Sequence, residues 1–154
     1  MRGTVLIRLC FLLLLTFAGA PFALGADAKQ STYYVQLIRG NNDDHPPASG
    51  ARQIGPRLTK RFRPVFKWEN YWEMSRQEVV LTQGQKTRLK LSKEREVEID
   101  LTNPAKRKVI AYSAGKPVCS ATRPVGEAKT IIGADRDANS VWFIVVRRDK
   151  PVSE

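Results

Sequence analysis

The sequence predicts an all-β fold, a small β-sandwich that is Ig-like or similar, with about seven to eight short strands and one short helix. Three observations support this prediction. Apolar and polar residues alternate over residues 85–102, residues 141–147 form a nearly continuous apolar run, and turn-forming residues recur at short, regular intervals. The length of 154 residues is that of one domain.

The N-terminal stretch has the features of a secretory signal peptide. Arg2 and Arg8 supply a positive start, residues 9–24 are mostly apolar, and small residues follow. The apolar run is shorter than the ~20 residues that a membrane-spanning helix needs. We therefore expect cleavage after Gly25, with Ala28 as a second choice. The product would be an extracytoplasmic protein, periplasmic or secreted, with no transmembrane span.

This cleavage divides the chain into four parts. They are a signal peptide at 1–25, a flexible N-terminus at 26–31, a single β-sandwich domain at 32–148 and a polar tail at 149–154. The first strand, residues 32–39, has apolar side chains on both faces, which is typical of a strand covered on both sides. Residues 40–50 are rich in Asn, Asp and Pro and predict an exposed loop.

The one predicted helix covers residues 54–62 and extends to about Arg63. Pro56 suits a first helical turn. Apolar residues recur every four positions and would form one stripe. This stripe consists of Ile54, Leu58 and Phe62. Pro64 is expected to end the helix, because proline disfavours helical geometry in the residue before it.

An aromatic-rich strand follows from Val65. Trp72 and Met74 occupy even-numbered positions and would point to one face of a regular strand. Val79 and Leu81 occupy odd-numbered positions and would point to the other face. A one-residue insertion reverses the two faces of a strand. We therefore expect a break or a β-bulge at residues 75–78.

Residues 85–102 predict a β-hairpin with a charge-paired outer face. A turn at residues 92–94 places Leu89 opposite Val97 on an apolar face. On the other face each cation meets an acid. These pairs are Lys86 with Asp100, Arg88 with Glu98, and Lys90 with Glu96. A shift by two residues would keep the same faces, so the alternation alone leaves the register open.

Four further strands are predicted after the turn at residues 103–106. They cover residues 108–113, 118–122, 129–132 and 141–147. The last is apolar at almost every position, which predicts a central strand covered on both faces.

The charge balance favours an acidic partner. The chain has 26 Lys and Arg against 15 Asp and Glu, a formal net charge of +11, or +9 once Arg2 and Arg8 are removed with the signal. Such an excess favours an acidic protein, an anionic polymer or a membrane surface. Export makes nucleic acid an unexpected partner. A single cysteine, Cys119, would remain, and no Asn-x-Ser/Thr site is present, which favours a bacterial envelope protein over an animal secreted one.

We expect no catalytic set, cofactor or metal. His45, the sole histidine, lies in the Pro-rich loop. Glu96 and Glu98 have a spacing that glycosidases use, but the facing cations oppose the raised pKa that a general acid needs. A run of oxygen-bearing residues at 135–139 lacks the Gly and Glu that a calcium loop requires. Cys119 is expected to be a small buried residue rather than a reactive thiol.

A basic-aromatic stretch is the strongest binding candidate. Its cations would neutralise anions while its rings stack on bases or sugars. The candidate residues are Arg57, Lys60, Arg61, Arg63, Lys67, Trp68, Tyr71 and Trp72. The alternative is that the rings belong to the core and the cations to the solvated surface. Two further basic groups occur at residues 106–108 and at 147–150.

The sequence thus favours a non-enzymatic binding or accessory module of the bacterial envelope, which docks through its basic surface. Two alternatives stay open: a carbohydrate-binding or carbohydrate-active sandwich, and a structural subunit of an envelope assembly.

Overall fold

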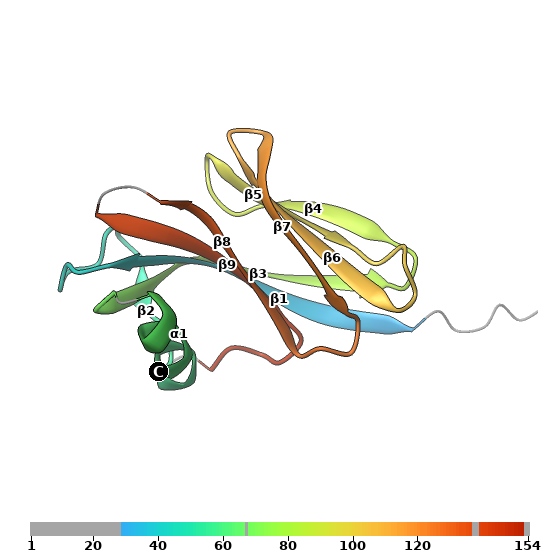
Figure 1. The fold of residues 1–154 in the computed structure, drawn as a ribbon, viewed down its shortest axis with the longest axis horizontal. Helices are drawn as coiled ribbons and strands as arrows, with labels where there is room; N and C mark the ends of the chain where they lie inside the picture. Colours follow the sequence, from blue (N-terminus) through green and yellow to red (C-terminus); the bar gives the residue numbers. More distant parts are fainter. Residues whose placement is uncertain (1–28, 67, 137–138, 153–154) are drawn as a thin grey trace, which may run out of the picture.

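A computed structural model describes residues 29–66, 68–136 and 139–152, and the predicted signal peptide lies outside them. These residues form nine strands in two antiparallel sheets and one short helix, so the predicted all-β sandwich is confirmed (Figure 1). The five-stranded sheet contains, in spatial order, β2 (Arg52–Gln53), β3 (Asn70–Thr82), β1 (Gln30–Asn41), β9 (Ser140–Arg147) and β8 (Lys129–Arg136). The four-stranded sheet contains β4 (Lys86–Lys90), β5 (Arg95–Asp100), β6 (Lys106–Ser113) and β7 (Lys116–Pro124).

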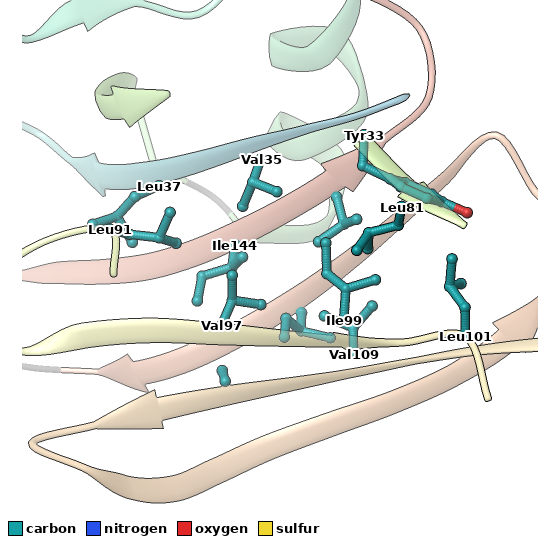
Figure 2. Close-up of a cluster of buried hydrophobic side chains, with 13 residues drawn as sticks. Tyr33, Val35, Leu37, Leu81, Leu91, Val97, Ile99, Leu101, Val109 and Ile144 are labelled. Carbon is teal, nitrogen blue, oxygen red and sulfur yellow. The ribbon is translucent and has the colours of Figure 1, made fainter. Parts of the chain in front are cut away.

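The main core lies between the two sheets. Figure 2 shows side chains from both sheets pointing toward one another. Tyr33, Val35 and Leu37 of β1 project from one sheet, and Val97 and Ile99 of β5 project from the other. Alternate positions supply these residues because successive side chains of a strand point to opposite faces.

A second core lies on the other face of the five-stranded sheet, beneath α1 (Pro56–Phe66) (Figure 1). Leu58 and Phe62 of the helix pack there against Ile38 of β1 and against Phe143 and Val145 of β9. The central strands β1 and β9 are therefore covered on both faces, as their apolar sequences predict.

The helix does not end before Pro64, as the sequence analysis expected, but continues to Phe66. Proline removes one backbone donor and so costs a helical hydrogen bond. The last turn, however, brings the Phe66 ring to 5.5 Å from Phe62 and 4.3 Å from Phe143, measured between ring centroids. This aromatic packing compensates for the missing bond.

Strand β3 is continuous and contains one β-bulge. Leu37 pairs with Ser75, but Ile38 pairs with Glu73, so Met74 is the extra residue. The bulge lies one residue before the predicted interval of 75–78. In the four-stranded sheet, β4 and β5 pair in the register that the charge alternation indicated, with Lys86 opposite Asp100 and Lys90 opposite Glu96.

Arg107 of β6 departs from the expectation of a solvated basic group at residues 106–108. Its side chain is fully buried, lies over the Tyr33 ring, and donates to the carbonyl of Glu127 and to Oγ1 of Thr130. Its Nε and Nη1 atoms have no partner. Successive side chains of a strand point to opposite faces, so Arg107 points to the core while Lys106 and Lys108 point to solvent. Arg107 therefore does not belong to the basic surface.

In the part of the chain that the structure describes, no helix has the length and apolar character needed to span a membrane.

Replacing Phe62 by Ala should destabilise the fold by about 3–5 kcal/mol, because it removes the ring at the centre of the helix-side core. Urea unfolding would measure this loss. The control is Val65→Ala on the same helix, where the side chain is 65% exposed, and a change within about 0.5 kcal/mol is expected. Equal losses for the two variants would show that α1 does not dock through Phe62.

Replacing Arg107 by Met should leave stability within about 1 kcal/mol of the wild type, because Met fills much of the volume and removes a buried charge that forms no ion pair with any described residue. Arg107→Ala should cost about 2–4 kcal/mol, since it leaves a cavity and two lost hydrogen bonds. Denaturant unfolding of both variants separates the packing of the side chain from its charge. A Met variant as unstable as the Ala variant would mean that the guanidinium itself is required.

Candidate functional site

The aromatic residues of the candidate binding stretch mostly belong to the core. Tyr71 is 2% exposed and packs on Phe62, with 5.1 Å between ring centroids. Trp72 is 6% exposed, and its Nε1 donates to Oδ1 of Asn41 at 3.1 Å. Trp68 is half-buried beside the helix-side core. Buried rings cannot stack on a sugar, so these residues do not form an exposed aromatic platform.

The cations of the same stretch lie on the outer face of α1. Arg57, Lys60, Arg61 and Arg63 are all exposed. The helix presents them to solvent because its apolar stripe is turned toward the sheet. Lys67 lies outside the described residues. The described cations of the predicted surface are therefore exposed, whereas Tyr71 and Trp72 are buried and do not lie beside them on the surface.

A cleft of about 440 Å³ lies beside α1, where the helix leaves part of the five-stranded sheet uncovered. It is bordered by β2, by the middle of β1 and β3, by the start of β8 and the end of β9, and by the segment that follows β9. We call it the basic cleft, because six cations line it and only two carboxylates do. The cations are Arg52, Arg57, Arg76, Lys129, Arg147 and Lys150, and the carboxylates belong to Glu73 and Asp149.

A buried polar network lies along the basic cleft. The carboxylate of Glu73 accepts hydrogen bonds from Nε2 of Gln36 and from Nη2 of Arg76, the latter at 2.9 Å. Gln36 is only 3% exposed, and its Oε1 has no hydrogen-bond partner. Glu73 is thus neutralised by Arg76, and the network leaves one buried acceptor unused.

The segment after β9 forms one wall. Asp149 forms an ion pair with Arg147, and this hydrogen bond holds the pKa of the Asp149 carboxyl below its usual value. Nη1 of Arg76 donates to the carbonyl of Pro151 at 3.3 Å, and Pro151 is buried. The predicted polar tail is therefore attached to the sheet at least as far as Pro151.

The remaining four cations of the cleft form no ion pair with a described residue. Within the described residues no carboxylate lies within ion-pairing distance of Arg52, Arg57, Lys129 or Lys150. Burial lowers the pKa of the Lys129 ammonium below its usual value, and the nearby charge of Arg147 lowers it further. Asp149 opposes this by raising the pKa, and Arg61 and Arg57 add smaller effects that lower it. Lys129 therefore lies in a positive potential to which β9 and α1 both contribute.

The other candidate residues are dispersed or engaged in local structure. Glu96 forms an ion pair with Arg88, and Glu98 accepts from the Tyr112 hydroxyl. Hydrogen bonds from Thr102, first from its side chain and then from its backbone, lower the pKa of Asp100. That direction is opposite to the one a general acid needs.

The other residues that the sequence offered as candidates are His45, Cys119 and the run at 135–139. His45 is exposed, and Cys119 is partly buried against the core between the sheets. The run at 135–139 lies partly outside the described residues. Among the residues that are described, no group of three or more His, Cys, Asp or Glu could hold a metal ion.

Sequence analysis missed the floor of the basic cleft. Gln36, Glu73 and Arg76 lie on β1 and β3, and the antiparallel pairing that places Gln36 opposite Arg76 joins residues about forty positions apart. Lys129 was part of a predicted strand but of no predicted site. A signal was present in Gln36 and Glu73, which are polar residues with apolar neighbours on both sides in the sequence.

No protein-family model, curated protein or solved structure matches the chain.

Replacing Asp149 by Asn should lower stability slightly near neutral pH and have no effect in acid. A carboxyl whose pKa is lowered in the native state contributes stability above its unfolded pKa, and this contribution disappears as the pH falls through the native pKa. The difference between Asp149→Asn and the wild type in urea unfolding should therefore shrink as the pH falls below about 4 and vanish below the native pKa of Asp149. Glu94→Gln, which changes an exposed carboxylate, serves as the control. A difference that persists in acid would exclude the ion pair as its source.

Proposed function

We propose that this protein is an exported, non-enzymatic binding or accessory module of the bacterial cell envelope, which docks through its basic surface on an acidic protein or an anionic polymer. Export and the bacterial setting follow from the signal-peptide pattern, the single remaining cysteine and the lack of glycosylation sites in the sequence.

One observation carries the docking proposal: cations from separate elements converge on one cleft that holds too few carboxylates to balance them. Arg52 comes from β2, Arg57 from α1, Lys129 from β8 and Lys150 from the segment after β9. Gathering like charges is unfavourable in the free protein: after burial, the charge of Arg147 is the next contribution to the lowered pKa of Lys129. A concave cationic site concentrates anions, and an anionic partner would relieve the repulsion.

The basic surface is continuous beyond this cleft. Arg61, on the outer face of α1, lines a second hollow together with Arg123 and Lys129. Lys129 thus borders both hollows. An extended anionic partner could therefore contact the helix and the edge strand β8 at the same time.

Removing the four cations of α1 should weaken binding to polyglutamate by roughly ten- to a hundredfold at low salt, because each exposed charge contributes about 0.2–1 kcal/mol. The variant replaces Arg57, Lys60, Arg61 and Arg63 by Gln. Its matched control replaces Lys90, Lys93, Lys106 and Lys116 by Gln, which are exposed residues of the four-stranded sheet and its turns. Fluorescence anisotropy with labelled polymer would measure both.

The control should lose far less affinity, and wild-type binding should weaken steeply with salt, since exposed charges are screened over ~8–10 Å at physiological ionic strength. Equal losses in the two variants would mean that net charge alone attracts the polymer. Binding that salt does not change would contradict the electrostatic mechanism.

A further inference from the structure

We infer that the basic cleft binds a short acidic peptide segment of a partner protein; this inference rests on the proposed function and names the partner class and the site. The peptide would carry at least two carboxylates and would lie between α1 and the segment after β9.

The charge of the cleft sets the first requirement. After Glu73 pairs with Arg76 and Asp149 with Arg147, four cations are left for a ligand. A single carboxylate would leave most of this charge unbalanced. Two carboxylates, spaced along a chain, could reach Arg57 on one wall and Lys129 on another.

The buried network sets the second requirement. The Glu73 carboxylate only accepts hydrogen bonds, so the NH₂ group of Gln36 must face it, and Oε1 of Gln36 is turned away without a partner. Nε of Arg147 is also buried and lacks an acceptor. Both residues line the cleft. A fitting ligand therefore has a donor and an acceptor besides its charges, and a peptide unit supplies both through its N–H and C=O.

The chain itself shows how a peptide is held here. The Asp149 carboxylate contacts Arg147, and the Pro151 carbonyl accepts from Arg76. An acidic residue followed by a bound carbonyl is thus already present along one wall. A partner segment would make the same kinds of contact with Arg52, Arg57 and Lys150, and would add to the attraction that Asp149 already exerts on Lys129.

The walls of the cleft favour a peptide over other polyanions. They include apolar side chains as well as cations. These apolar residues are Ile54, Pro56, Leu58 and Val152. Polyphosphate has no N–H donor for Gln36 and no apolar group for these walls. Sulfated oligosaccharides have hydroxyl donors but lack apolar side chains.

The test uses a blocked peptide with two aspartates and an intervening leucine, acetylated and amidated so that its ends carry no charge. Arg57→Gln should weaken binding about tenfold, the effect of losing one charge-assisted hydrogen bond. Lys60→Gln is the matched control, because it removes one exposed cation from the same helix but does not line this cleft. Titration calorimetry would give both affinities.

NMR gives a second measurement that long-range attraction would not reproduce. Bound peptide should shift the side-chain amide signals of Gln36 and raise the pKa of the Lys129 ammonium, because an anion lowers the local positive potential. The NMR signal of the Lys60 ammonium, which serves as the control, should shift little. Polyphosphate and a sulfated disaccharide are tested in parallel at equal charge.

The outcomes separate the two proposals. Peptide binding with the predicted Arg57 effect and Gln36 shifts supports the inference. Equal weakening by Arg57→Gln and Lys60→Gln, or preferential binding of polyphosphate or the disaccharide in the cleft, overturns the peptide inference but keeps the proposed anionic docking. Absence of binding to all these probes and to polyglutamate would overturn both.

Discussion

The structure depends on the coverage of the five-stranded sheet on both of its faces. Its central strands, β1 and β9, are apolar on each side, so neither face can remain in water. The four-stranded sheet buries one face and α1 buries the other. The helix is too short to cover the whole second face, and the rest is closed by polar side chains and by the segment after β9. The basic cleft therefore lies at the boundary of the helix-side core.

This arrangement fixes the helix and strands that carry the basic surface. The helix is held by Leu58 and Phe62, and the strands are held by the cores on both faces. The backbone positions of Arg52, Arg57 and Lys129 are therefore set by these cores, while their long side chains keep rotamer freedom. The buried Arg107 shows that positive charge alone does not define this surface: its backbone position on β6 directs it inward, where it stabilises contacts with Thr130 and Glu127.

Periodicity made much of the fold predictable, whereas the site depends on contacts distant in sequence. The register of the hairpin matches the charge pairing that the sequence suggested, although the alternation alone left it open, and the double coverage of β9 followed from a single apolar run. The two residues of β2 carry no periodic pattern, and the helix passes Pro64 because of ring packing with Phe143. The cleft needs the pairing of β1 with β3 and the return of the chain after β9, which no local pattern contains.

The charges of the cleft also link binding to protonation. Burial and neighbouring cations lower the pKa of Lys129, so the folded protein holds that proton less tightly than an unfolded chain would. An anion near Lys129 reverses the second effect, and by reciprocity the protonated protein binds the anion more strongly. The same repulsion that costs stability in the free protein thus becomes part of the affinity for an acidic partner. A site assembled in this way gains more from binding than an equal number of dispersed surface cations, because dispersed cations have little mutual repulsion to relieve.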